Sequence, residues 1–208
     1  MTREGRRGIA GLDVGPLDRH LALEERLFHA VNVDGGRVAD AAALLLSSPA
    51  FGVAWGVLLA AALWARRREG RWRWVVALGV AILVSDAVGS QVVRPLLARA
   101  RPAYALPPGA VRWIAPAADV GSLPSLHASN FFAMALVGAA GWPALAPLLY
   151  AVALGVSWSR VYVGVHWPGD VLAGAAWGTL AALVGLAAAR VRRRAARAPA
   201  GGAGAGPP

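Results

Sequence analysis

The stretch SRVYVGVHWPGD, residues 159–170, gathers chemically active side chains between long apolar runs. Pro168 suits the first position of a helix, which places Asp170 in the first turn and within reach of His166, four residues earlier. A carboxylate that binds one ring nitrogen of a histidine fixes the tautomer and raises the nucleophilicity of the other nitrogen. The spacing therefore predicts a nucleophilic His–Asp pair. The alternative is that Asp170 only complements the helix dipole and that His166 is an interfacial histidine.

Cations and hydrogen-bond donors occur in three separate stretches of the chain. The guanidinium groups that match the tetrahedral oxygens of phosphate are those of Arg94, Arg101 and Arg160. The donors that would join them are the hydroxyls of Ser125 and Ser159 and the backbone N–H groups at the start of the predicted helix that begins at residue 125. His127 supplies a second imidazole, free to protonate a departing oxygen. Together these residues predict a phosphoryl-transfer site that uses no metal.

Each of these residues also has a purely structural interpretation. An arginine beside an apolar run can extend its side chain to lipid headgroups, and this interpretation suits Arg99 best. Ser125 is placed to cap a helix, and His127 to lie at the interface. The convergence of three hairpin ends favours the site over these single explanations.

No metal or other cofactor is expected. Asp119 and Asp170 are the carboxylates that we place near the pocket, and they are too few for Mg²⁺ once Asp170 pairs with His166. The sequence contains no cysteine, which excludes disulfides, thiol catalysis and Cys-ligated metals.

The composition is that of a membrane protein. Hydrophobic residues make up 57% of the 208 residues, the mean hydropathy is +0.52, and the apolar residues occur in blocks. We expect an all-α, polytopic helical bundle. Its five transmembrane helices are predicted at residues 49–65, 74–93, 125–141, 143–159 and 168–189.

These spans belong to one predicted domain, residues 17–190. An amphipathic helix at residues 17–32 is expected to lie in the membrane interface, and a short helix at 37–48 leads into the first span. A flexible N-terminus, residues 1–16, and a basic, disordered C-terminal tail, residues 191–208, flank the domain.

The net charge of +10 is concentrated beside the apolar blocks. Arginine clusters at residues 66–73 and 190–197 follow the positive-inside pattern, so we expect a bilayer rather than nucleic acid as the partner. With five spans, this orientation puts the N-terminus and all of the predicted site residues on the outer side of the membrane.

Three motifs resemble the signatures of the type 2 phosphatidic acid phosphatase superfamily, KxxxxxxRP, PSGH and SRxxxxxHxxxD. Those motifs are Arg94-x6-Arg101-Pro102, Pro124-Ser125-Leu126-His127 and Ser159-Arg160-x5-His166-x3-Asp170. The resemblance covers about residues 17–190 in order and spacing. It implies His166 as the nucleophile that becomes phosphohistidine, Asp170 as its orienting partner and His127 as the general acid. It further implies that the phosphoryl oxygens are bound by Arg94, Arg101, Arg160, Ser125 and the backbone at Leu126.

The sequence departs from the family pattern at two positions. Arg94 stands where the family usually has Lys, which keeps the charge on a longer side chain. Leu126 replaces Gly, which keeps the N–H but adds bulk beside the pocket. Outside the motifs, Asp86 lies within a predicted span, where we expect a structural hydrogen bond to a neighbouring span.

The resemblance implies an integral-membrane, metal-independent lipid phosphatase of a bacterial cytoplasmic membrane, with the active site facing outside. Its substrate would be a lipid phosphate or pyrophosphate, with polyprenyl (undecaprenyl) pyrophosphate as the first choice. The alternatives are a phosphotransferase that uses the same phosphohistidine and an inactive relative that only binds lipid phosphates. The sequence does not predict an oligomeric state.

Overall fold

The computed structural model describes residues 22–66, 70–116 and 121–197, and within these ranges every regular element is a helix. The order is α1 (Ala22–Val31), α2 (Gly36–Leu46), α3 (Pro49–Arg66), α4 (Arg71–Leu83), the π-helical section η2 (Val84–Val93), α5 (Arg94–Leu97), α6 (Pro102–Ala105), α7 (Leu126–Gly141), the 3₁₀ turn η3 (Pro143–Leu145), α8 (Ala146–Tyr162) and α9 (Pro168–Arg197). The predicted all-α bundle is confirmed.

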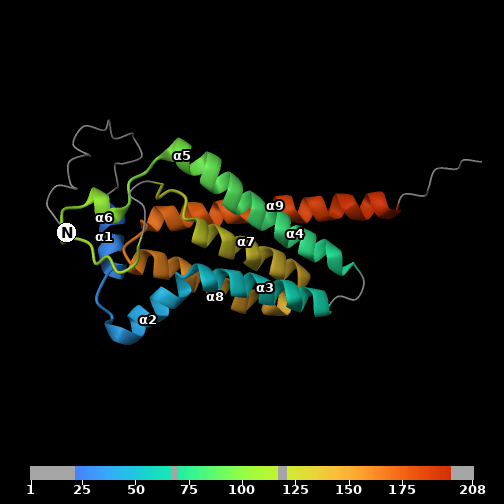
Figure 1. Ribbon diagram of the computed structural model, residues 1–208, viewed down its shortest axis with the longest axis horizontal. Helices are drawn as coiled ribbons and strands as arrows, with labels where there is room; N and C mark the ends of the chain where they lie inside the picture. Colours follow the sequence, from blue (N-terminus) through green and yellow to red (C-terminus); the bar gives the residue numbers. More distant parts are fainter. Residues whose placement is uncertain (1–21, 67–69, 117–120, 198–208) are drawn as a thin grey trace, which may run out of the picture.

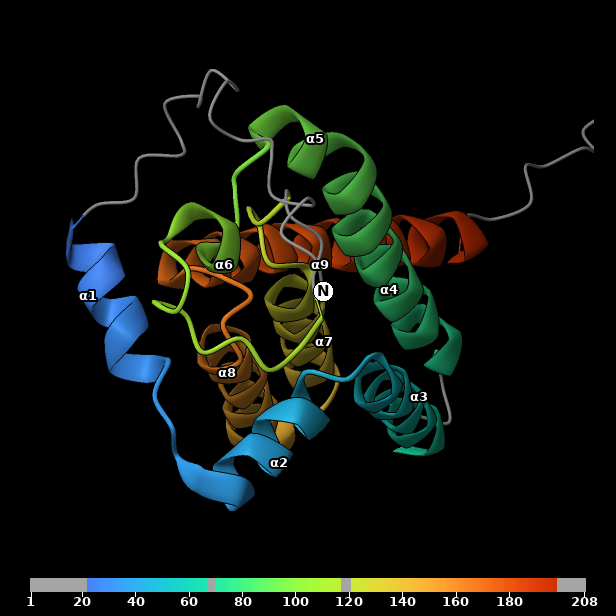
Figure 2. The same cartoon turned by 60° about the vertical axis from the view of Figure 1, so that its left-hand side comes forward.

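Helix α7 is the centre of the bundle, with α3, α4, α8 and α9 around it (Figure 2). Small residues allow these helices to approach closely, as is usual where helices pack within lipid. Gly174 and Gly178 of α9 lie against the backbone of Ser125, just before α7, and of Ser129 within it, where a Cβ atom would collide. Most of α7 is therefore buried, and its first turn is held in a fixed place.

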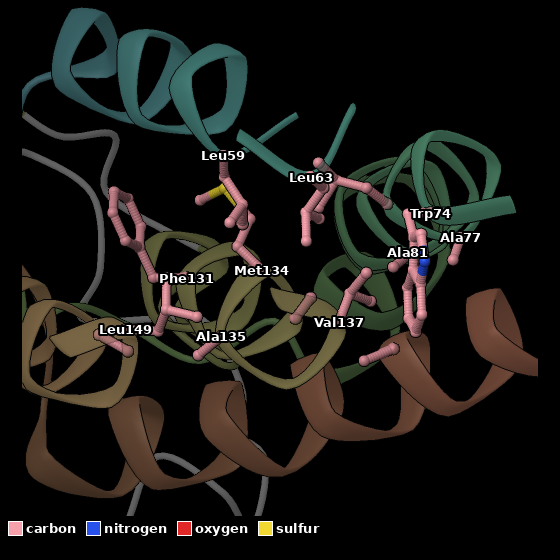
Figure 3. Close-up of a cluster of buried hydrophobic side chains, with 14 of the residues drawn as sticks. Leu59, Leu63, Trp74, Ala77, Ala81, Phe131, Met134, Ala135, Val137 and Leu149 are labelled. Atoms are coloured by element: carbon pink, nitrogen blue, oxygen red, sulfur yellow. The ribbon is translucent and has the colours of Figure 1, made fainter. Parts of the chain in front are cut away.

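The apolar core joins α3, α4, α7 and α8 (Figure 3). Its largest members include Leu59, Leu63, Trp74, Phe131, Met134, Val137 and Leu149. Gly141 of α7 provides the space that Leu63 and Trp74 occupy, because a Cβ there would lie 2.6 Å from Leu63 Cδ2. This packing fixes the frame on which the polar end of the bundle is built.

Four segments are long and apolar enough to cross a membrane: Pro49–Arg66, Arg71–Ala105, Pro143–Tyr162 and Pro168–Arg190. They match four of the five predicted spans, and the chain is an integral membrane protein. The remaining predicted span is α7, which is apolar but has only 16 residues. Since it is enclosed by longer helices, α7 does not need the length that a lipid-facing span requires.

Basic and aromatic residues meet at the end of the bundle where α3 ends and α4 begins. Arg66 lies 4.4 Å from the ring centre of Trp142, and Arg71 lies 4.3 Å from that of Trp64. Such pairs are typical of a membrane–water interface. In Figure 1 this end lies opposite α1, α2 and α6.

The ends of the chain depart in part from the prediction. Helix α1 falls within the predicted interfacial helix, and Phe28 from it is buried against Trp167. Helix α9 continues to Arg197, so residues 191–197 are helical and not part of a disordered tail. Alanine and arginine are strong helix formers, which explains the extension. The predicted flexible segment 1–16 and residues 198–208 lie outside the described residues.

Candidate active site

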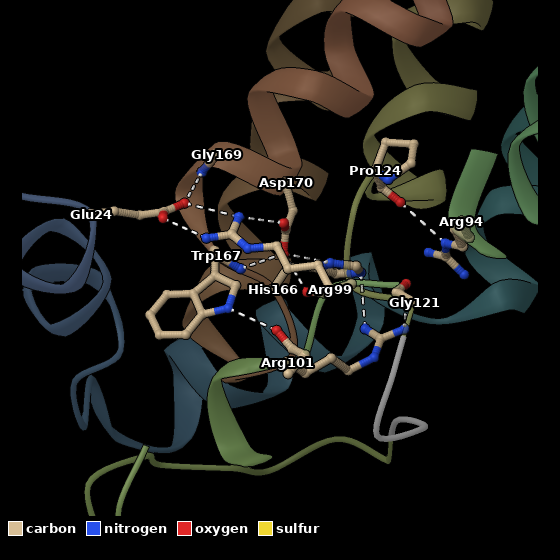
Figure 4. Close-up of polar contacts among 12 residues, drawn as sticks. Glu24, Arg94, Arg99, Arg101, Gly121, Pro124, His166, Trp167, Gly169 and Asp170 are labelled. Carbon is tan, nitrogen blue, oxygen red and sulfur yellow. Dashed lines mark hydrogen bonds and ion pairs between the residues drawn. The ribbon is translucent and has the colours of Figure 1, made fainter. Parts of the chain in front are cut away.

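The three motifs meet at one end of the bundle, where η2 passes into α5, α7 begins, and α8 turns into α9 (Figure 4). The α8–α9 turn is tight because Gly164 has a φ of +82° and lies against the backbone of Arg112, which leaves no room for a Cβ atom. This turn carries His166, whose side chain is 1% exposed.

His166 and Asp170 pair as the sequence predicts. Pro168 is the first residue of α9, and His166 Nδ1 lies 3.4 Å from Asp170 Oδ2. The same carboxylate oxygen accepts a hydrogen bond of 2.8 Å from the backbone N–H of Trp167, the residue before the helix. The carboxylate is therefore fixed at the helix N-terminus while it holds the imidazole.

Arg101 determines the tautomer of His166. Its Nη1 lies 3.1 Å from His166 Nε2 and donates to the carbonyl of Val165 at 2.8 Å. A guanidinium only donates, so Nε2 must be the accepting, unprotonated nitrogen and Nδ1 carries the proton toward Asp170. The lone pair of Nε2 thus faces Arg101, on the side of the site that carries the arginines.

The imidazole of His166 is neutral at physiological pH. Burial lowers its pKa to about 3, Arg101 and Arg160 act in the same direction, and Asp170 opposes them. No proton has to leave Nε2 before it can attack. Because the folded-state pKa lies below the ordinary 6.5, the fold loses stability as the pH falls from about 6.5 toward 3.

Arg99 has a role that the sequence interpretation missed. It does not extend to lipid headgroups: it is 6% exposed, and its Nη1 donates to Asp170 Oδ1 at 2.8 Å. Its Nη2 lies 2.6 Å from Glu24 Oε2 of α1, and Glu24 Oε1 accepts the backbone N–H of Gly169 at 2.9 Å. Together with a bond from the Ser122 hydroxyl, these contacts neutralise and orient the buried Asp170 carboxylate.

Six of the nine predicted site residues line one cavity of about 830 Å³: Arg94, Arg101, Leu126, His127, Arg160 and His166. Arg94 Nε donates to the carbonyl of Pro124 at 3.1 Å, and Arg160 Nη1 to that of Ser47 at 3.3 Å. Both arginines are thus tethered through one nitrogen beside the cavity. Three guanidinium groups and two imidazoles in one cavity have the charge and the hydrogen-bond donors to bind a phosphoryl group.

The other three predicted residues, Asp170, Ser125 and Ser159, do not line this cavity. Ser159 donates its hydroxyl to the carbonyl of Val156 at 2.7 Å and lies 2.9 Å from the hydroxyl of Ser47. It therefore supports the segment that holds Arg160. The Ser125 hydroxyl is buried and has no hydrogen-bond partner among the described residues, so its role as a phosphate ligand stays a proposal.

Leu126, the departure from glycine, is accommodated by Gly89 of η2. A Cβ atom on Gly89 would lie 2.6 Å from Leu126 Cδ2 and 3.0 Å from Trp177 Nε1. The leucine thus occupies space that a residue larger than glycine at position 89 would fill. The backbone start of α7 is preserved despite the added bulk.

The carboxylates near the site differ from the prediction. Besides Asp170, Glu24 binds Arg99 and Asp86 lines the cavity, whereas Asp119 lies outside the described residues. Asp86 makes the predicted hydrogen bond to a neighbouring span, because Asn130 Nδ2 of α7 donates to it at 3.1 Å. Within the described ranges, no group of three or more His, Asp or Glu side chains is placed to hold a metal ion.

Fold and site define a helical membrane protein with a histidine–aspartate pair and a cluster of arginines at one end of the bundle. The chain belongs to the PAP2 superfamily: the model of that family matches residues 74–194, more than half of the sequence.

Two curated relatives are named as phosphatases. Over 134 residues the chain is 31% identical to a lipid A 4'-phosphatase of Bacteroides thetaiotaomicron, and the match covers 59% of each protein. Over 72 residues it is 40% identical to the putative undecaprenyl-diphosphatase YbjG of Escherichia coli K12, with 34% of each covered. The chain thus spans less than two thirds of the length of either relative.

Two crystal structures share the fold. Aquifex aeolicus LpxE has a TM-score of 0.64 and 23% identity, over 80% of this chain and 96% of that one. The PAP2-type phosphatidylglycerolphosphate phosphatase of Bacillus subtilis has a TM-score of 0.57 and 18% identity, over 81% and 85%.

Loss of the Glu24–Arg99 support is expected to impair the site, and loss of Arg99 also to destabilise the fold, because the buried Asp170 carboxylate then has one donor fewer. Should the site release phosphate from a lipid phosphate, Arg99→Ala is expected to lower the kcat by about 10- to 100-fold, as is usual for partners that orient a reactive group. Glu24→Gln is expected to act in the same direction but less. The control is Glu25→Gln, next on α1, whose carboxylate pairs with His29 at 3.8 Å. Equal effects of the two glutamine variants would contradict this role.

A double-mutant cycle tests the pairing of Gly89 with Leu126. Gly89→Ala is expected to destabilise the protein by about 1–3 kcal/mol through overpacking, and Leu126→Ala in the same chain should recover most of this loss. Gly79→Ala in α4 is the matched control, because a Cβ atom there meets nothing within 4 Å. Thermal unfolding in detergent provides the measurement, and additive effects of the two substitutions would show that the residues are not coupled.

Proposed function

We propose that the chain is a lipid phosphatase that hydrolyses a lipid phosphate or pyrophosphate through a phosphohistidine on His166. The observation that carries this proposal is the continuity of one cavity. Its polar end holds the arginines and His166, and its other end lies among apolar residues of α3, α4 and α7, including Val57, Leu78 and Met134. A phosphate attached to a hydrocarbon tail matches both ends.

The proposed reaction has two steps. Nε2 of His166 attacks phosphorus, the bond between phosphorus and the leaving oxygen breaks, and His127 donates a proton to that oxygen. Water then attacks the phosphohistidine, His127 takes up a proton from it, and inorganic phosphate leaves. Arg94, Arg101 and Arg160 stabilise the charge on the phosphoryl oxygens, a contribution that divalent metals make in other phosphotransfer sites.

Two substrate classes merit direct comparison. A polyprenyl pyrophosphate is the first candidate, since one relative is named as a putative undecaprenyl-diphosphatase. A phosphorylated glycolipid is the second, favoured by the longer match to a protein named as a lipid A 4'-phosphatase. Phosphate release from both classes by the purified protein, in detergent with EDTA present, tests the proposal. Activity on neither class, or activity only after Mg²⁺ is added, would contradict it.

The two histidines are expected to respond differently to the leaving group. His127→Ala should lower turnover of a phosphomonoester by about 10² to 10⁴-fold, because an alkoxide needs a proton to depart. The loss should be smaller with a pyrophosphate, whose leaving phosphate is already a stable anion. His29→Ala, on the half-exposed face of α1, serves as the control. An equal loss with both substrates would remove His127 from the role of general acid.

We further propose that the site opens on the outer side of a bacterial cytoplasmic membrane. The arginine-rich ends of α3 and α4 lie opposite the site, as the positive-inside pattern requires (Figure 1). Because the chain has no cysteine, single cysteines can test this orientation. Ala105→Cys, at the exposed end of α6, should react with an impermeant thiol reagent in intact cells, whereas Ala65→Cys should react only after lysis. The reverse pattern would mean that the topology is inverted.

A further inference from the structure

Asp86 is an exposed carboxylate within a membrane-spanning helix, and it faces the cavity that the proposed substrate enters. It lies in the π-helical section η2, eight residues before Arg94. Its hydrogen-bond partner Asn130 follows His127 by three residues on α7, which at the rise of an α-helix is about 4.5 Å further along the axis. Asp86 is therefore deeper in the membrane than the arginines, beside the part of the lipid that follows the phosphate.

Asn130 of α7 lies opposite and has a fixed orientation. Its Oδ1 accepts a hydrogen bond of 2.6 Å from the hydroxyl of Ser85, so its Nδ2 must point toward Asp86, where it donates at 3.1 Å. Ser85 is held in turn by Ser129 at 2.6 Å, and its carbonyl accepts the indole N–H of Trp177 at 3.0 Å. The pair is thus built into the helix packing and presented to the cavity.

The described part of the chain offers Asp86 no hydrogen bond besides the one from Asn130. A single amide donor does not satisfy a carboxylate, which has about four acceptor positions. An ionisable group at this depth is costly, and its retention usually reflects a function. Asp86 can accept a further hydrogen bond from a ligand, and its charge disfavours a second phosphate in the same place.

We propose that Asp86 and Asn130 form a subsite that recognises a hydroxyl or amide N–H in the substrate, close to the bond that joins the phosphate to the lipid. The chemical class is a phospholipid with a sugar, hydroxyl or amide group near the phosphate. This inference rests on the proposed function and, of the two substrate classes compared there, favours the phosphorylated glycolipid over the polyprenyl pyrophosphate. A polyprenyl chain and an ester-linked diacylglycerol have no such donor, so they leave the carboxylate unsatisfied.

Ceramide 1-phosphate and phosphatidate with tails of equal length are the matched probes. Both are two-tailed phosphomonoesters, but only ceramide carries a hydroxyl and an amide N–H near the phosphate. We expect the wild-type protein to prefer ceramide 1-phosphate in kcat/KM. Asp86→Val should lower this value by about ten- to hundredfold, the usual effect of losing a hydrogen bond to a charged group, and should change that for phosphatidate less than about twofold.

Two further variants make the test specific. Asp86→Asn keeps the shape of the side chain and one acceptor oxygen, so it should lose part of the preference for ceramide 1-phosphate. This variant replaces Asp86→Val in the test if Asp86→Val does not fold. Ile82 lines the same cavity, and Ile82→Val should leave the preference for ceramide 1-phosphate unchanged. Equal losses on both lipids would assign Asp86 to charge balance near Arg94 and overturn the subsite, as would no loss on either.

Binding separates this inference from the proposed function. If the wild-type protein releases phosphate from no lipid, the proposed function fails. The affinities for the two probes still decide the subsite, since ceramide 1-phosphate must bind more tightly to the wild-type protein and lose that advantage in Asp86→Val. Equal affinities of the wild-type protein for the two lipids would overturn the subsite.

Discussion

The buried carboxylate of Asp170 is the constraint on which the rest of the site depends. A charge at a fully buried position is tolerated only when donors surround it, and here they come from Trp167, Ser122, Arg99 and His166. His166 and Trp167 are neighbours of Asp170, but Arg99 and Ser122 are 71 and 48 residues away, so the hydrogen bonds to one carboxylate join three separate segments. The orientation of the imidazole is a consequence, because Nδ1 must face Asp170 and leave Nε2 toward Arg101.

The bilayer imposes the second constraint. A bundle of apolar helices can keep charged groups at its end or along an internal cavity, and this protein does both. The central position of α7 follows from its small residues and from the glycines of α9 that pack on it. As a result, the start of α7 brings His127 to the same cavity as the arginines. The packing of the apolar part thus determines the geometry of the polar part.

Much of the site could be predicted because its spacing is local. Short segments of the sequence contain the four-residue separation of His166 and Asp170, the start of a helix at Pro168 and each of the family motifs. The role of Arg99 could not be predicted, because its partner Glu24 is 75 residues away on an amphipathic helix with no distinguishing pattern. Ser159 belongs to the third motif, but its hydroxyl contacts Val156 and Ser47 instead of the cavity, because the packing of the helices places it there. The π-helical section likewise gave no clear signal, whereas the extension of α9 follows from the helix propensity of its alanines and arginines.

The central claim is that Nε2 of His166 is the nucleophile and that Asp170 holds Nδ1. The most direct test is rapid-quench trapping of the phosphoenzyme formed with a labelled lipid phosphate, followed by identification of the modified atom. We predict an acid-labile, base-stable phosphohistidine at His166 with phosphorus on Nε2, and its absence from His166→Ala. Phosphorus on Nδ1, on another residue, or a wild-type level of phosphoenzyme in His166→Ala would contradict the account.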